Sequence, residues 1–253
     1  MRESAGDPGG GGRPPLILVP GLDGTALLFY RQAPRLERAF AVSTHPLPDD
    51  PAVTMDDLVD RLAATIEERA PEGVVLVGES FGGALSMSAA LARPDLVRAL
   101  VIVNSFPWLD QRWRLHLAPL LLRLVPWAAM PIVRTFTASR LHSRHTLPAD
   151  LEQFHLRSRA IGRSGYLRRL EILRTYDIRS RLSSLTVPVL FLAGDEDRLL
   201  PSARWARYMA QRVPSADLTI LEGYGHICLI NHDLDLLDHV EPWWRAAVVG
   251  DRS

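Results

Sequence analysis

The sequence predicts an α/β fold with a mostly parallel sheet, helices on both of its faces and a helical insertion. Three observations lead to this prediction. Short apolar runs alternate with helical patterns near both ends of the chain, which is typical of strand–helix–strand units. Strand signals are missing between residues 107 and 181, where leucine, tryptophan and arginine recur in short pieces separated by prolines. The chain has 253 residues, 47% of them hydrophobic and 23% charged, which suits one globular domain carrying an insertion.

The expected strands are apolar runs bounded by glycine, proline or polar residues. In chain order they are PLILVP (15–20), AFAVSTHPLP (39–48, including the strand exit), VVLV (74–77), VRALVIVN (97–104), VPVLFLAG (187–194) and ADLTILEG (216–223).

The expected helices follow these strands. Thr54 and Asp57 form a capping-box pattern that opens a helix at 55–69. An alanine- and leucine-rich run, FGGALSMSAALA, predicts a helix directly after Ser80. Pro201 suits the first turn of a helix that ends near residue 212. The run DLDLLDHVEPWW (233–244) is expected to start the closing helix.

These elements divide the chain into three parts. Residues 1–14 are expected to be a disordered leader, because the segment is polar and glycine-rich and lacks the apolar region of a signal peptide. Residues 15–106 and 182–253 form the expected core, and residues 107–181 the helical cap. The longest apolar stretch, 115–133, contains three prolines, Arg123 and His116, which argues against a membrane span. We therefore expect a soluble, cytoplasmic protein with no integral membrane segment.

The composition also excludes several classes of partner and chemistry. There are 29 basic and 29 acidic residues, so no charge excess favours nucleic acid or an anionic membrane. Every basic residue is arginine, which excludes Schiff-base chemistry on lysine. Cys228 is the only cysteine, so no intrachain disulfide forms, and its expected role is to fill the core.

The segment GESFGG (78–83) carries the strongest chemical signal. Ser80 falls at a sharp turn between a predicted strand and a predicted helix, the context that a G-x-S-x-G motif requires. Such a turn crowds the positions two before and two after the serine. Gly78 and Gly82 remove that crowding because they lack a Cβ, and Gly83 lets the helix approach the sheet.

A serine becomes a good nucleophile when a base accepts its proton and an acceptor orients the base. Ligands of open α/β sheets gather beyond the carboxyl ends of the strands, so partners are expected there. Asp195, Glu196 and Asp197 follow the strand at 187–194, and His226 follows the strand at 216–223. The chemical groups therefore occur in the order serine, acid, histidine.

With these residues the chain resembles the α/β-hydrolase superfamily, as a serine esterase-like member with a helical cap. The resemblance extends over about residues 15–245 and rests on three motifs in order. They are Gly78–Glu79–Ser80–Phe81–Gly82, Gly194–Asp195–Glu196–Asp197 with Pro201, and Gly225–His226.

The resemblance implies a role for each residue of the site. Ser80 is the expected nucleophile, His226 the base and Asp197 the orienting acid, since that aspartate usually lies three residues after the glycine. Asp195 is the alternative acid, or it could hold the loop in an Asx-turn. The oxyanion hole is expected from the backbone N–H groups of Phe81 and Leu22.

The oxyanion loop departs from the family pattern. Many members have His-Gly where this chain has Pro20–Gly21, but a backbone amide donor survives that change. Asp23 is the second candidate for the donor of this loop, whose sequence PGLDGT also resembles esterase and acyltransferase members.

The implied activity is hydrolysis of a carboxylic ester of a small or moderately apolar substrate, through an acyl-enzyme. A serine at position 80 disfavours dehalogenase and epoxide hydrolase chemistry, where an aspartate is used. Acyl transfer and thioester cleavage use the same triad and stay open, as does a non-enzymatic ligand receptor or scaffold.

No cofactor or metal is expected. The histidines of the cap are expected to pack or face solvent, because their spacing does not form a metal set; they are His116, His142, His145 and His155. His232 is expected to be structural, at the start of the closing helix.

Two further features of the cap point in different directions. Its apolar residues are expected partly to pack on the sheet domain and partly to line a pocket for an acyl or alcohol group; they are Trp108, Trp113, Leu115, Leu117, Leu120, Leu121, Leu122, Leu124 and Trp127. The arginines that crowd the far end of the cap are expected to form a solvated face, with steering of an anionic substrate as the alternative; they are Arg157, Arg159, Arg163, Arg168, Arg169, Arg174, Arg179 and Arg181.

Overall fold

The computed structural model of the chain describes residues 12–109 and 142–250. Most of the predicted leader, and the apolar cap residues from Trp113 to Trp127, lie outside the described residues. Among the described residues, no helix is both long and apolar enough to span a bilayer.

The sheet has six strands in the order β2-β1-β3-β4-β5-β6, and all five pairings are parallel. The strands are β1 (Pro15–Val19), β2 (Ala41–Thr44), β3 (Val74–Glu79), β4 (Val97–Val103), β5 (Val189–Gly194) and β6 (Ala216–Leu221). Each one falls within or overlaps a predicted run. The predicted α/β-hydrolase sheet is confirmed.

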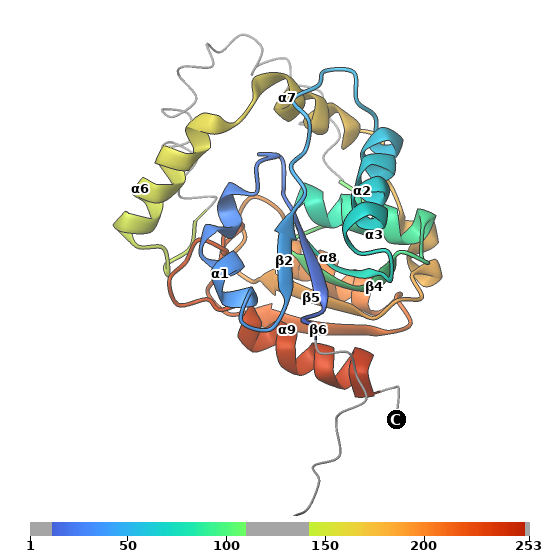
Figure 1. Cartoon of the computed structure of the whole chain (residues 1–253). Helices are drawn as coiled ribbons and strands as arrows, with labels where there is room; N and C mark the ends of the chain where they lie inside the picture. Colours follow the sequence, from blue (N-terminus) through green and yellow to red (C-terminus); the bar gives the residue numbers. More distant parts are fainter. Residues whose placement is uncertain (1–11, 110–141, 251–253) are drawn as a thin grey trace, which may run out of the picture.

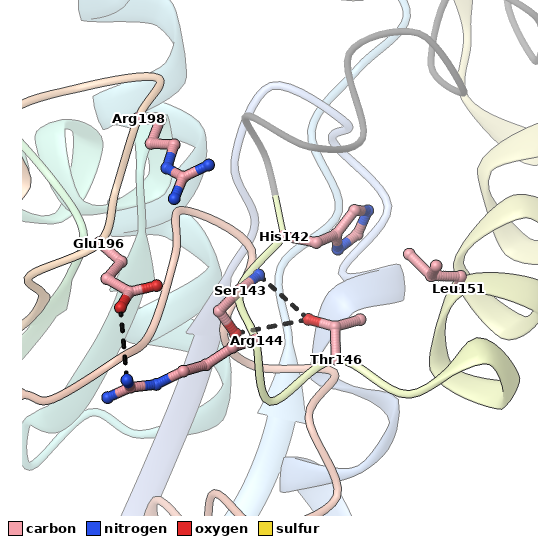
Figure 2. A pocket seen from close by; sticks show the side chains of 7 residues that line it. All are labelled: His142, Ser143, Arg144, Thr146, Leu151, Glu196 and Arg198. Atoms are coloured by element: carbon pink, nitrogen blue, oxygen red, sulfur yellow. Dashed lines mark hydrogen bonds and ion pairs between the residues drawn. The ribbon is translucent and has the colours of Figure 1, made fainter.

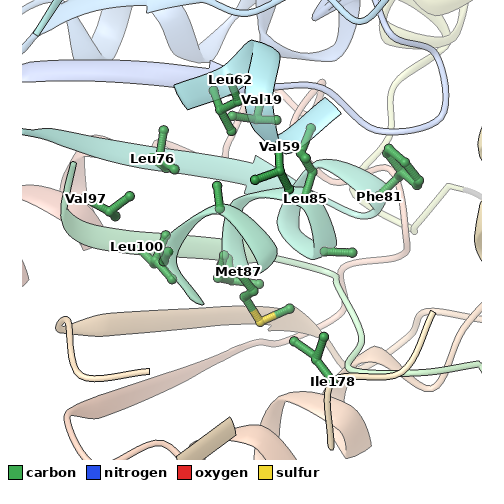
Figure 3. Packing of buried hydrophobic residues seen from close by; sticks show 14 of the residues in the cluster. Val19, Val59, Leu62, Leu76, Phe81, Leu85, Met87, Val97, Leu100 and Ile178 are labelled. Atoms are coloured by element: carbon green, nitrogen blue, oxygen red, sulfur yellow. The ribbon is translucent and has the colours of Figure 1, made fainter. Parts of the chain in front are cut away.

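Helices cover both faces of the sheet (Figure 1). The described α-helices are α1 (Gln32–Leu36), α2 (Met55–Arg69), α3 (Phe81–Ala92), α6 (Pro148–Arg157), α7 (Arg163–Ile172), α8 (Ser202–Ala210) and α9 (Leu237–Trp244). Helices α2, α3 and α8 supply one buried apolar cluster, and α1 and α9 supply residues of the other. Figure 3 shows part of the first cluster, to which α2 contributes Leu62, α3 contributes Leu85 and β3 contributes Leu76.

Helix α2 begins where its capping box predicts. The Thr54 hydroxyl accepts a hydrogen bond from the Asp57 amide at 3.1 Å, and the Asp57 carboxylate accepts one from the Thr54 amide at 2.8 Å. Both groups satisfy amides that a helix terminus leaves without an intrahelical partner.

Because β1 and β3 are neighbours, the loops that follow them start side by side at the carboxyl edge of the sheet. After β1 the chain moves outward to β2 at one edge, and after β3 it moves to β4 on the other side. The loops that leave β1 and β3 therefore diverge at the carboxyl edge of the sheet, where α/β folds bind ligands. Val19 pairs with Gly78, so the loop after β1 starts beside the end of β3.

Two predictions near the carboxyl end need correction: the start of the closing helix and the position of His232. The closing helix starts at Leu237 rather than at residue 233, because residues 232–236 form turns whose polar groups bind back to α1. The Gln32 side chain, for example, accepts from the Leu236 amide and donates to the Leu234 carbonyl. His232 therefore does not lie at the start of that helix, and its half-exposed ring faces the Asp150 carboxylate at 3.9 Å.

The described part of the predicted cap contains helices α6 and α7, joined and flanked by turns and irregular segments, and a single antiparallel bridge between Trp108 and Asp177. Helices α6 and α7 lie on the side of the molecule opposite α9 (Figure 1). Of the eight arginines between residues 157 and 181, four are exposed: Arg157, Arg159, Arg179 and Arg181. Arg169 contradicts the prediction of a solvated face, because it is fully buried between α7 and the loop after β1.

Candidate active site

The turn between β3 and α3 holds Ser80 in a backbone conformation that non-glycine residues rarely adopt. Ser80 has φ 53° and ψ −115°, and its amide donates to the Val103 carbonyl at 2.9 Å. A Cβ on Gly78 would approach the Gly82 carbonyl oxygen to 2.5 Å, and one on Gly82 would collide with the Val19 carbonyl. The turn is therefore a strained elbow whose two glycines let three backbone segments pack in contact.

Ser80, His226 and Asp197 form a chain of hydrogen bonds. The Ser80 Oγ lies 3.1 Å from His226 Nε2, and His226 Nδ1 lies 2.7 Å from Asp197 Oδ2. Asp197 is held in turn by the amides of Leu199 and Leu200, each at 2.9 Å, so its carboxylate has little freedom to rotate. This is the arrangement in which a base accepts the serine proton and an acid orients the base.

The electrostatics of the pair agree with that arrangement. Burial alone raises the pKa of Asp197, but the neighbouring imidazole and the donors around the carboxylate lower it below 3.8 overall. Burial alone lowers the pKa of His226, and Asp197 outweighs it, so the net pKa lies above 6.5. The carboxylate is therefore charged at neutral pH and stabilises an imidazolium.

The other two acids of the same loop do not contact His226. Asp195 accepts a hydrogen bond from the Gly223 amide at 2.7 Å, which ties the loop after β5 to the loop after β6. Glu196 faces the exposed Arg144 guanidinium at 3.8 Å. This contact links two strand loops, whereas the Asx-turn predicted as the alternative role of Asp195 would stay within its own loop.

Backbone amides near Ser80 are available to bind an anion. Phe81 is the first residue of α3, so its N–H has no acceptor within the helix. In the loop after β1, the Gly21 amide binds Glu79 and the Gly24 amide donates to the Gly21 carbonyl. No described residue accepts from the Leu22 N–H. These contacts leave the predicted donors, the N–H groups of Phe81 and Leu22, without an acceptor among the described residues.

Comparison with known proteins identifies the family. A model of the alpha/beta hydrolase family matches residues 16–238. The chain belongs to this family. It is 29% identical over 228 residues to a protein of Serratia proteamaculans named putative carbamate hydrolase RutD, with 84% of each chain covered. It is also 26% identical to phytyl ester synthase 1 of Arabidopsis thaliana, covering 94% of this chain and 39% of that one.

Solved structures share the alpha/beta hydrolase fold at lower sequence identity. A thermophilic esterase from Thermogutta terrifontis superposes with a TM-score of 0.80 at 18% identity, covering 94% of this chain and 92% of that one. MenH from S. aureus superposes with a TM-score of 0.78 at 16% identity and 96% coverage of both.

Glu79, inside the hydrolase elbow, is a buried acid that the motif gave no reason to single out. Its carboxyl lies 4.0 Å from His226 Nε2 and is 3% exposed. Burial raises the pKa of Glu79 to about 8, while the charge of His226 opposes that rise. Glu79 is therefore largely neutral at pH 7 and couples to the ionisation of the histidine.

Asn104 and Ser105, directly after β4, also support the site. The Asn104 side chain donates to the carbonyls of Gly225 and His226 at 3.0 and 2.8 Å and accepts from the Gly194 amide at 2.8 Å. Ser105 donates to the Ser80 carbonyl at 2.7 Å. The sequence signal for both residues is a polar side chain at the carboxyl end of a strand. Neither an amide nor a hydroxyl is the acid or the base that an activated serine requires, so this signal did not single them out.

The remaining candidates lie away from the reacting groups. Cys228 is buried in the core beside Asn104, and burial raises the pKa of its thiol. His145 bonds Asp233 at 2.7 Å and stacks on Tyr224, whereas His142 packs edge-on against Phe154. Within the described ranges, no group of three or more potential ligands is placed to hold a metal ion.

A pocket of about 380 Å³ opens beside the loop that carries Asp197 (Figure 2). Glu196 and Arg198, the sequence neighbours of Asp197, line one side of the pocket. The other lining residues are His142, Ser143, Arg144 and Thr146, together with Leu151 of α6. Ser80 and His226 do not line it. The pocket is therefore adjacent to the candidate site without containing it.

Proposed function

We propose that this hydrolase cleaves a carboxylic ester of a small or moderately apolar substrate through an acyl-enzyme. The observation that carries the proposal is the hydrogen-bonded chain of Ser80, His226 and Asp197 at the elbow after β3. Nucleophile, base and orienting acid are within hydrogen-bonding reach of one another, and the base has a raised pKa suited to accepting a proton.

In this mechanism His226 Nε2 accepts the hydroxyl proton as Ser80 Oγ attacks the ester carbonyl. The carbonyl oxygen becomes an oxyanion that the N–H groups of Phe81 and Leu22 stabilise. His226 then gives its proton to the departing alcohol, which leaves the acyl group on Ser80. Water enters, loses a proton to His226 and attacks the acyl-enzyme, and collapse of the second intermediate returns Ser80 to its starting state.

Two other outcomes of the same acyl chemistry have support from the relatives. The name of the Arabidopsis relative is that of an ester synthase, which favours acyl transfer to an alcohol instead of to water. The names of several bacterial relatives indicate a carbamate substrate, whose carbonyl the same serine would attack. Ester hydrolysis is our first choice over acyl transfer because it needs no acceptor other than water. It is our first choice over carbamate cleavage because an ester carbonyl is more electrophilic than a carbamate carbonyl.

The test is hydrolysis of a panel of chromogenic carboxylic esters, thioesters and carbamates by the wild type and by Ser80→Ala. We expect turnover of at least one short ester, and a loss of roughly 10³-fold or more in Ser80→Ala and in His226→Ala. A fluorophosphonate should add once, at Ser80, as measured by intact mass. No turnover across the panel together with no adduct on the folded protein would favour the receptor or scaffold alternative.

A further inference from the structure

Arg169 is the most deeply buried arginine of the described cap. It lies on α7, is 1% exposed, and reaches from the cap into the sheet domain. Its Nε and Nη2 atoms both donate to the Leu22 carbonyl, at 3.0 and 2.9 Å, and its Nη1 donates to the Pro48 carbonyl at 2.9 Å. One guanidinium therefore joins α7 to the loops that follow β1 and β2.

The two glycines on either side of this guanidinium indicate that space is reserved for it. Gly24, in the loop after β1, has φ +72°, and a Cβ there would lie 2.6 Å from Arg169 Nη2. Gly165, one turn before Arg169 on α7, would place a Cβ 2.8 Å from Nη1. A side chain at either position would displace the guanidinium from the carbonyls that it binds.

The charge of Arg169 is retained despite its burial. Burial lowers the pKa of Arg169 from 12.5, and the carboxylates of Asp23 and Asp49 counteract that decrease. Asp49 also accepts a hydrogen bond from the Gly165 amide, so the same acid braces α7. Removing the charge from a buried site like this leaves carbonyl acceptors without donors, which is costly.

The position of Leu22 gives this contact a consequence for catalysis. Its N–H is one of the two candidate oxyanion donors, and its carbonyl is the group that Arg169 holds. These two groups meet at the Leu22 Cα: the N–H lies in the Gly21–Leu22 peptide, and the carbonyl lies in the Leu22–Asp23 peptide, which also carries the Asp23 N–H, the second candidate donor. Because peptides are planar, a guanidinium that holds the Leu22 carbonyl fixes the plane of the Leu22–Asp23 peptide and limits rotation about the Leu22 Cα.

We propose that Arg169 is a positioning residue through which cap helix α7 holds the oxyanion loop, Gly21–Thr25, in its catalytic conformation. The inference rests on the proposed serine hydrolase function. In this arrangement both parts of the protein contribute to the oxyanion hole: the sheet domain supplies the amides, and the cap fixes their direction.

The experiment compares Arg169→Met and Arg169→Lys with Arg168→Met as the matched control. Arg168 is the preceding residue of α7, but it donates to the Val53 carbonyl at 2.6 Å and not to the oxyanion loop. Active-site titration with a fluorophosphonate gives the competent fraction of each protein, and kcat and KM are then measured on the best ester. The dissociation constant of a trifluoromethyl ketone, which forms a tetrahedral oxyanion adduct on serine, is measured alongside.

We expect Arg169→Met to lower kcat by ~10- to 100-fold with KM within about 2-fold, since oxyanion donors act in the transition state. The dissociation constant of the ketone should rise by a similar factor. Arg169→Lys should fall in between, because an ammonium can bind the Leu22 carbonyl but cannot also reach Pro48 as a planar fork does. Arg168→Met should keep both values near wild type.

Three results would overturn the inference. One is an unchanged kcat and ketone affinity in Arg169→Met, and another is a loss confined to KM. If Arg169→Met does not fold, Arg169→Lys decides, and wild-type ketone affinity in that variant would count against the role. Absence of Ser80-dependent turnover in the wild type would instead remove the proposed function and the inference together.

Discussion

The elbow after β3 and the cap helix α7 show two different ways of fixing a catalytic backbone. The elbow is held by contacts of the main chain itself: Ser80 donates to Val103, and Gly82 packs on the Val19 carbonyl. Helix α7 instead reaches the loop after β1 through one long side chain, Arg169, whose carbonyl acceptors lie 121 and 147 residues away in sequence. Both modes involve glycines, but Gly78 and Gly82 flank Ser80 in the sequence, whereas Gly24, beside the Arg169 guanidinium, lies far from Arg169 in the sequence.

The two modes also differ in how they respond to change. Backbone contacts at van der Waals distance leave no room for one added methyl group, so the elbow should fail abruptly. A guanidinium bound to carbonyls can be replaced in part by another cation, so the cap contact should weaken in steps. Substitutions in the site and in the elbow should therefore have larger effects than substitutions of the side chains that support them.

The largest effect is expected for the acid of the site. Asp197→Asn should lower kcat/KM by about 10³- to 10⁴-fold, because an amide in place of the carboxylate no longer orients the histidine or stabilises its charged form. Asp195→Asn, two residues away, should have a small effect, since Asp195 holds a loop amide and does not contact His226. Steady-state kinetics of both variants measure this. The reverse ranking would transfer the role of acid to Asp195.

The elbow can be broken with a single methyl group. Gly82→Ala should destabilise the protein by about 3 kcal/mol or prevent folding, since its Cβ would collide with the Val19 carbonyl of the central sheet. Denaturant unfolding measures the change. Ser88→Ala, on the same helix, is the control and should change stability by less than about 1 kcal/mol. A Gly82→Ala protein as stable and active as wild type would show that the elbow can relax.

A smaller effect is expected for the buried acid of the elbow. The folded-state pKa of Glu79, about 8, lies above the ordinary value of 4.5. Its contribution to stability is therefore complete below about pH 4.5 and is lost as pH rises through about 8. Glu79→Gln cannot ionise, so its melting temperature should decline less between pH 5 and pH 8.5 than that of the wild type.

The matched control for this measurement is Glu68→Gln, which changes an exposed acid on α2. Its melting temperature should follow the wild type across the same pH range. If Glu79→Gln declines in parallel with both, the Glu79 carboxyl is not held neutral in the folded protein, and its coupling to His226 is weaker than the 4.0 Å separation suggests.

The sequence predicted most of the sheet and the three residues that the structure brings together as a hydrogen-bonded chain. The strands were visible because buried parallel strands are continuous apolar runs, and α2 was visible because Thr54 and Asp57 satisfy each other locally. The positions of Ser80, Asp197 and His226 followed from the rule that sites lie at the carboxyl ends of strands.

Other features were hidden because they depend on which distant backbone groups meet. Arg169 is one of 14 arginines between residues 107 and 181, and nothing in its neighbours predicts that it faces the Leu22 carbonyl. The start of the closing helix was misplaced because Gln32, about 200 residues earlier, draws the amides and carbonyls of 229–236 into turns. Carbonyl oxygens are the same at every position, so a sequence does not reveal where they accept.

The hydrogen bonds of the Asn104 side chain include two to a loop that is synthesised much later than Asn104 itself. Asn104 binds the carbonyls of Gly225 and His226, which follow it by 121 and 122 residues. Ser80 precedes its partner His226 by 146 residues. A nascent chain thus exposes its serine long before the ribosome has added the histidine or the loop that Asn104 anchors. Until then His226 is absent, so in the proposed mechanism an incomplete chain lacks the base that would take the proton of Ser80.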